Sequence, residues 1–167
     1  MPGLPFGAAQ QHSIPAEFQT YEGIAGIEFI DMRPDLPYPR SAAYRRCADG
    51  AQMRVRDRAA EIAEVDLDEQ QARAYLSALV ERGLFFWHRT YRPAQGTFVL
   101  DAPQWRLEVT FDKLGGKRCR PFRAEGEGTY PDNFEEVAGA LMAPGAHLAD
   151  GEEPTEESAA GPETDGE

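Results

Sequence analysis

Residues 105–112, WRLEVTFD, carry the clearest structural signal in the sequence. Apolar and polar side chains alternate along it without a break, and the apolar ones are Trp105, Leu107, Val109 and Phe111. Successive side chains of a β-strand point to opposite faces of the sheet, so this period of two predicts a strand with one buried and one solvent-facing side. The glycines of residues 114–117, LGGK, predict a turn into a partner strand over residues 118–124.

Further strands are expected before residues 105–112. Residues 21–32, YEGIAGIEFIDM, stop at a proline-rich turn and predict one strand. Residues 43–58 predict a hairpin around Asp49 and Gly50, because an Asp-Gly pair supplies the positive φ angles of a tight turn. A brief strand is also expected over residues 97–100.

Residues 67–82 have the apolar spacing of a helix, with large side chains recurring at intervals of three and four. Asp66 and Glu69 suit a capping box at its start, and Gly83 suits the position after its end. The sequence therefore predicts a helix over about 67–82.

A second, shorter helix is expected near the end of the folded part. Asp132 and Glu135 form its capping box, and it is expected to run to about Met142. Pro144 and Gly145 then end it.

This order of elements predicts an α+β fold. We expect a two-layer sandwich, with an antiparallel sheet of about 4–6 strands and both helices on one face of the sheet. The other face would be wet or covered by a partner.

The charge is concentrated at one end of the chain. The formal net charge is −12, but residues 144–167 hold eight acidic residues and no Lys or Arg, so residues 1–143 carry only about −4. We expect a flexible leader over 1–19, a single domain over 20–143 and a disordered acidic tail over 144–167. The acidic balance makes nucleic acid an unlikely partner, although the modest charge of residues 1–143 softens that exclusion.

Composition also bears on location. No apolar run approaches the roughly 20 residues that span a bilayer, and the first residues have no basic region followed by an apolar one, so we expect no membrane partner and no export. Two cysteines, Cys47 and Cys119, rule out a disulfide scaffold. The expected location is the cytoplasm.

Residues 84–135 carry a spaced aromatic pattern. It consists of Trp87-x3-Tyr91, then Asp101-x3-Trp105-x-Leu107-x-Val109, then Gly126-x-Gly128-x-Tyr130-Pro131-x-Asn133-Phe134. The pattern resembles small bacterial α+β proteins of unassigned function, and departs from them at Ala102-Pro103, where a glycine would follow Asp101. The resemblance implies the fold and supplies no activity.

Candidate catalytic residues are few. His88, Asp101 and Tyr130, with Tyr91, would have to converge on one pocket to form a small hydrolase or transferase site. The alternative is that His88 lies at the edge of an aromatic cluster that seals the helix against the sheet. No metal-ligand spacing and no cofactor motif is visible, so no metal and no cofactor are expected.

Arginines alternate along the expected strands. If their faces coincide, they make a basic sheet surface formed by Arg54, Arg56, Arg58, Arg106, Arg118 and Arg120. Guanidinium groups suit an anionic ligand, an acidic peptide or the chain's own C-terminal tail, which could mask this surface. The competing interpretation is a solvated face whose arginines pair with acids such as Glu108.

The hypothesis favoured by the sequence is a non-enzymatic binding or regulatory module that uses this sheet face. The hydrolase or transferase around His88, Asp101 and Tyr130 is the alternative.

Overall fold

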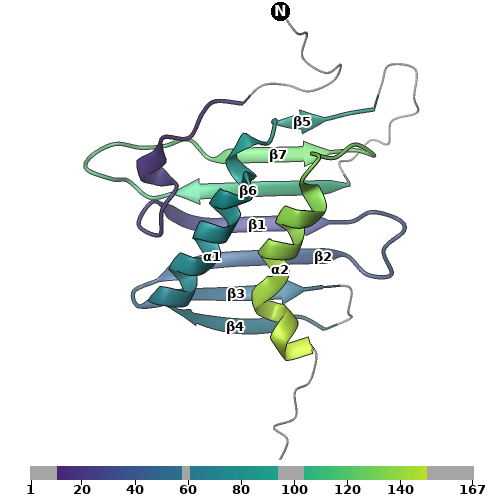
Figure 1. Ribbon diagram of the computed structural model, residues 1–167, viewed down its shortest axis with the longest axis horizontal. Helices are drawn as coiled ribbons and strands as arrows, with labels where there is room; N and C mark the ends of the chain where they lie inside the picture. Colours follow the sequence, from purple (N-terminus) through teal and green to yellow (C-terminus); the bar gives the residue numbers. More distant parts are fainter. Residues whose placement is uncertain (1–10, 58–60, 94–103, 150–167) are drawn as a thin grey trace, which may run out of the picture.

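The computed structural model describes residues 11–57, 61–93 and 104–149. It has two layers, a sheet and a pair of helices that both lie on one face of that sheet (Figure 1). The strands are β1 (Ile24–Asp31), β2 (Arg40–Cys47), β3 (Gly50–Arg56), β4 (Ala63–Asp68), β5 (Thr90–Tyr91), β6 (Trp105–Phe111) and β7 (Phe122–Gly126). The helices are α1 (Glu69–Glu81) and α2 (Phe134–Ala149), with single 3-10 turns at η1 (Ala16–Phe18) and η2 (Leu84–Phe86).

The sheet has seven strands in the order β4-β3-β2-β1-β6-β7-β5. The α+β class is confirmed, but the expected count of 4–6 strands is wrong. A purely antiparallel sheet is also wrong, because β5 pairs with β7 in the parallel direction. The central contact joins β1 to β6, so residues about 80 positions apart in the chain, such as Ile27 and Val109, lie opposite each other.

The additional strand β4 occupies residues expected partly as helix. Ala63, Val65 and Leu67 alternate with acidic residues, and Leu67 pairs with Ala51 of β3. The strand continues to Asp68, which is the N-cap of α1. The capping box is therefore formed by Asp68 and Gln71, and the expected box at Asp66 and Glu69 is wrong.

Two other boundaries differ from expectation. Strand β7 begins at Phe122, later than the expected residue 118. Helix α2 continues to Ala149 with Pro144 inside it, so the expected end near Met142 is wrong. Gly145 lets α2 pack closely on β3, because a Cβ at this position would lie 2.6 Å from the Cβ of Val55.

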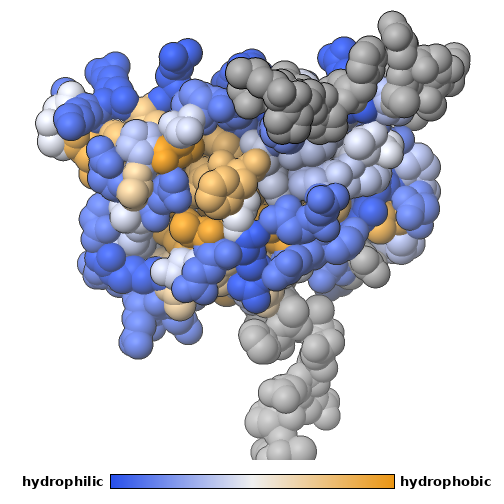
Figure 2. All heavy atoms as spheres, turned by 45° about the horizontal axis from the view of Figure 1, so that its top comes forward, coloured by the Kyte–Doolittle hydropathy of each residue, from blue (hydrophilic) through white to orange (hydrophobic). Residues whose placement is uncertain are grey.

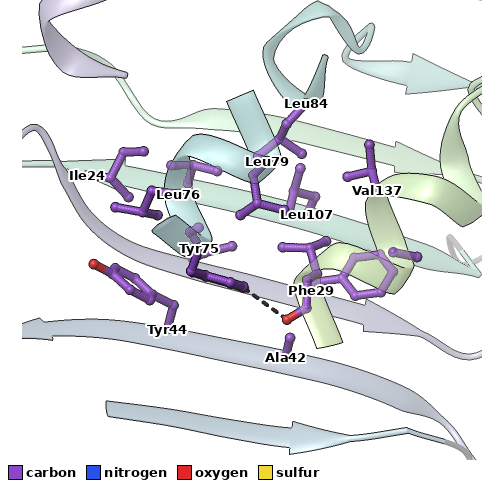
Figure 3. Close-up of a cluster of buried hydrophobic side chains, with 14 of the residues drawn as sticks. Ile24, Phe29, Ala42, Tyr44, Tyr75, Leu76, Leu79, Leu84, Leu107 and Val137 are labelled. Atoms are coloured by element: carbon purple, nitrogen blue, oxygen red, sulfur yellow. Dashed lines mark hydrogen bonds between the residues drawn. The ribbon is translucent and has the colours of Figure 1, made fainter. Parts of the chain in front are cut away.

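The core fills the space between the helices and the sheet (Figure 3). Tyr75, Leu76 and Leu79 of α1 are buried against sheet residues such as Phe29 and Leu107. Tyr75 stacks on Tyr44 of β2 with ring centroids 5.6 Å apart, and its hydroxyl donates a 3.0 Å hydrogen bond to the carbonyl of Leu141 in α2. Burial of this kind is the main stabilising contribution to such a fold.

The packed part of the chain begins before residue 20. Ile14 and Phe18 are buried in the core although they belong to the expected leader. The Gln11 side chain donates to the carbonyl of Trp87 at 3.4 Å and accepts from the backbone N–H of Arg123 at 3.0 Å. It thereby fixes the N-terminal segment to the start of β7.

Candidate functional site

The face of the sheet opposite the helices is the candidate site. No described helix or strand covers it (Figure 1). Side chains alternate between the two faces, so the residues flanking buried Phe29 and Leu107 point away from the core. We call this surface the open face; its side chains are Glu28, Ile30, Ser41, Ala43, Arg45, Gln52, Arg54, Arg56, Glu64, Asp66, Arg106, Glu108, Arg123 and Glu125.

The open face is concave. A depression of about 610 Å³ lies over four neighbouring strands. It is lined by residues 28–30 of β1, 41–43 of β2, 106–108 of β6 and 123–125 of β7. Ser41 and Ala43 of β2 are small, whereas β1, β6 and β7 beside them contribute longer charged side chains. The depression therefore combines a floor of small side chains at β2 with charged side chains on β1, β6 and β7.

Acidic and basic groups are interleaved on the open face. Arg54 pairs with Glu64 at 3.0 Å, and Arg123 pairs with Glu108 at 2.6 Å. Both pairs join adjacent strands and are largely exposed, so each contributes about 1 kcal/mol or less to stability. The open face is charge-mixed, not uniformly basic.

Two charges in the depression lack such partners among the described residues. Glu28 lies directly opposite Glu108 across β1 and β6, and no described cation lies within ion-pair distance of it. Arg106 lies opposite Glu125 of β7, yet forms no ion pair with any described acid. These groups are available to a partner.

The sequence-predicted arginines are only partly brought together. Arg54, Arg56 and Arg106 lie on the open face, as their alternation predicts. Arg118 and Arg120 are exposed in the connection between β6 and β7, because β7 begins after them. Arg58 lies outside the described residues.

The candidate catalytic residues form part of an aromatic cluster. The His88 ring lies 5.7 Å from the Tyr91 ring, and the His88 backbone N–H donates to the Tyr91 hydroxyl at 2.8 Å. Tyr91 and Tyr130 both contact Trp105, with ring centroids 5.6 and 6.3 Å from it. Asp101 lies outside the described residues, so the hydrolase or transferase site stays a prediction.

Burial raises the pKa of both tyrosines in this cluster. For Tyr91, desolvation outweighs the hydrogen bond from His88, and for Tyr130, desolvation outweighs the nearby charge of Arg33. A phenol of ordinary pKa is already protonated at neutral pH, and the raised pKa keeps both tyrosines hydrogen-bond donors there.

The glycines near Tyr130 also have a structural reason. A Cβ at Gly126 would lie 2.4 Å from the indole nitrogen of Trp105, which donates to the carbonyl of Thr129 at 3.1 Å. Gly128 adopts a φ of 61°, which favours glycine. The two glycines make room for Trp105 and turn the chain toward α2.

An apolar area lies on the helix side of the molecule, toward the β5 edge (Figure 2). Within η2, Leu84 is buried and Phe85 is partly buried against Phe111 and Phe122. Phe86, in contrast, is 87% exposed. Leu84 and Phe85 therefore pack inward, whereas Phe86 reaches solvent.

A buried ionic cluster was not foreseen from the sequence. Asp31 at the end of β1 and Arg40 at the start of β2 are fully or almost fully buried on the helix side, and Arg40 Nη2 donates to Asp31 Oδ2 at 2.7 Å. Arg33 and Glu135 complete the cluster. The signal available was an acid and a base at the two ends of the proline-rich turn, where paired strands bring them face to face.

Neither a metal-binding cluster nor a membrane-spanning helix occurs among the described residues. Within them, no group of three or more His, Cys, Asp or Glu side chains could hold a metal ion. Over the same ranges, neither α1 nor α2 combines the length and the apolar character needed to cross a bilayer. Cys47 and Cys119 are both free thiols.

Comparison with known proteins returned no relative: no family model, no curated protein and no solved structure matches this chain.

Proposed function

We propose that the protein is a non-catalytic binding module that holds a partner on the open face. The observation that carries this proposal is the depression of about 610 Å³ on the face opposite the helices. Half-covered sheets normally leave one solvated face, and a concave solvated face with a small-residue floor gives a partner a surface to fit.

The charges favour a particular class of partner. Glu28, Glu108 and Glu125 in the depression disfavour a purely anionic ligand there, because burial beside these carboxylates would be repulsive. Arg106 in the same depression, and Arg54 on the β3 side, suit acidic groups. The partner we propose is a polypeptide segment of mixed charge, whose acidic side chains contact these arginines.

Site-specific crosslinking tests this proposal. A photoreactive amino acid at Ala43, on the floor of the depression, should give a discrete crosslinked protein in extracts of the source organism. The matched control is the same group at Ser77, which is exposed on α1 at the other side of the molecule. Arg106→Glu should reduce the crosslink from position 43.

The outcomes are distinguishable. A species captured from position 43, absent from position 77 and weakened by Arg106→Glu supports the open face as the contact surface. Equal crosslinking from positions 43 and 77, or crosslinking from position 43 that Arg106→Glu does not reduce, would show that the open face is an ordinary solvated surface.

A further inference from the structure

A second candidate site lies on the helix side of the sheet, where the end of β1 and the start of β2 meet the start of α2. Its base is Asp31, whose side chain is fully buried. Asp31 Oδ1 and Oδ2 accept from Arg33 Nε at 3.0 and 2.9 Å, and Oδ2 also accepts from Arg40 Nε and Nη2 at 3.1 and 2.7 Å. Asp31 therefore holds the two guanidinium groups side by side from their buried side.

The outer edges of both guanidinium groups converge on one further carboxylate. Glu135 Oε1 accepts from Arg33 Nη2 at 2.8 Å and from Arg40 Nη2 at 3.2 Å, and Glu135 Oε2 accepts from Arg40 Nη1 at 3.1 Å. The side chains differ greatly in exposure: Arg40 is 3% exposed, whereas Glu135 is 59% exposed. A buried cationic surface is thus closed by a single side chain that reaches solvent.

Additional features favour a negative group at this position. Glu135 lies in the first turn of α2, where the helix dipole attracts anions. Arg33 is held in place by the rings of Tyr130 and Phe134, which lie 5.2 and 5.4 Å from its guanidinium carbon. Neither arginine has to reorganise to receive an oxyanion, since Asp31 and the two rings already set their orientation.

We propose that Arg33 and Arg40 form a binding site for an oxyanion group of a ligand, phosphate or carboxylate, and that the Glu135 carboxylate occupies this site until the ligand displaces it. Two guanidinium groups present several donors in fixed planes, which matches the geometry of either group. A phosphate has more charge and more acceptor oxygens than the carboxylate of Glu135, so it can replace it. The site is independent of the open face, because its residues lie on the other side of the sheet.

The test is a titration with inorganic phosphate and, separately, with acetate, followed by NMR of the arginine Nε–H groups at constant ionic strength. The proteins compared are the wild type, Glu135→Gln, Glu136→Gln and Arg33→Gln. Arg33→Gln removes one of the two proposed ligand-binding guanidinium groups. Glu136 is the matched control, because it is the exposed neighbour of Glu135 and makes no ion pair with the described residues. The two anions distinguish a phosphate ligand from a carboxylate ligand.

The wild type and Glu136→Gln should show the same saturable shifts of the Arg33 and Arg40 signals. If Glu135 fills the site about nine-tenths of the time, Glu135→Gln should bind about tenfold more tightly, because the competing side chain is gone. Arg33→Gln, checked for folding by its methyl spectrum, should lose the saturable shift of Arg40.

Three outcomes would overturn the proposal. Absence of saturation in every variant would show that the cluster is only structural. Binding to Glu135→Gln without binding to the wild type would show that the substitution itself created the site. Equal affinities of Glu135→Gln and Glu136→Gln would show that Glu135 does not compete.

Discussion

Glu28 and Glu108 lie directly opposite one another in β1 and β6, with both carboxylates on the open face. Arg123 neutralises Glu108, but no described cation does so for Glu28. Like charges directly opposite across two strands are destabilising, so this arrangement is unfavourable for the isolated domain.

Glu28→Gln should therefore stabilise the protein, by about 0.2–1 kcal/mol in chemical unfolding. The gain should shrink as salt is raised, because screening already weakens the repulsion in the wild type. Glu136→Gln, on the exposed side of α2, should change stability little. A loss of stability in Glu28→Gln would mean that Glu28 is engaged by a cation.

The stacked tyrosines Tyr44 and Tyr75 should respond differently to loss of their hydroxyls. The Tyr44 hydroxyl is buried without a hydrogen-bond partner among the described residues, whereas that of Tyr75 donates to Leu141. Tyr44→Phe should be neutral or stabilising, and Tyr75→Phe should cost about 0.5–1.5 kcal/mol, measured by urea unfolding. Equal losses in both variants would contradict this assignment.

The same burial has a spectroscopic consequence. Desolvation raises the pKa of Tyr44 to about 12, so an alkaline titration followed by ultraviolet absorbance should show a late-ionising tyrosine. The step near pH 12 should lose the amplitude of one tyrosine in Tyr44→Phe. The other late-ionising tyrosines, Tyr75, Tyr91 and Tyr130, whose pKa values burial also raises, should remain. Loss of amplitude in the early part of the curve, near pH 10, would instead show that Tyr44 ionises with the exposed tyrosines.

The contribution of Glu135 to stability should depend on pH. Burial alone would raise the pKa of Glu135, but the hydrogen bonds from Arg40 and Arg33 outweigh it and hold the pKa below its usual value. A carboxylate with a lowered pKa in the folded state stabilises the protein fully above the usual carboxylate range. That stabilisation is lost as the pH falls through the lower, folded-state pKa.

The measurement compares the unfolding free energy of the wild type and Glu135→Gln from pH 7 down to pH 3. The wild type should be the more stable at pH 7, and the difference should shrink progressively below about pH 4.5. Glu136→Gln provides the baseline. A difference in unfolding free energy that stays constant over this range would show that Arg33 and Arg40 do not lower the pKa of Glu135.

Two glycines of α2 should give opposite results on substitution by alanine. A Cβ at Gly139 meets no atom within 4 Å, so Gly139→Ala should stabilise the helix by about 0.5–1 kcal/mol. A Cβ at Gly145 would lie 2.6 Å from Val55 Cβ, so Gly145→Ala should lower the thermal midpoint. A rise in the midpoint for Gly145→Ala would show that α2 does not pack this closely on β3.

Local periodicity predicted the elements that are regular over several residues. The alternation of residues 105–112 predicted β6, and the Asp49-Gly50 pair predicted the hairpin of β2 and β3. Strand β4 was missed because its last residue, Asp68, also begins a helix, so the apolar spacing of α1 masks the strand before it. The two-residue strand β5 is too short to carry any periodic signal.

The continuation of α2 and the ionic cluster depend on contacts distant in sequence. Pro144 and Gly145 are stop signals in an isolated helix, and the close approach of Gly145 to Val55 is a packing contact that the local sequence does not reveal. The charges of Asp31 and Arg40 were visible, but their meeting with Glu135, about 100 residues later, requires the tertiary fold. For the open face, alternation placed Arg54 and Arg106 correctly, while the depression itself arises from four strands together.

The bridge made by Gln11 has a consequence for solubility. An unpaired strand edge is a template on which a second chain can add a strand and start aggregation. At one edge of this sheet, β5 covers only the end of β7, and Gln11 takes up the backbone N–H of Arg123 at its start. At the opposite edge, β4 carries Glu64, Asp66 and Asp68, whose charges repel a second copy of the same edge. Gln11 at one edge and Glu64, Asp66 and Asp68 at the other therefore oppose edge-to-edge association of two sheets. Removal of the first residues through Gln11 would leave the start of β7 free to pair with a second chain.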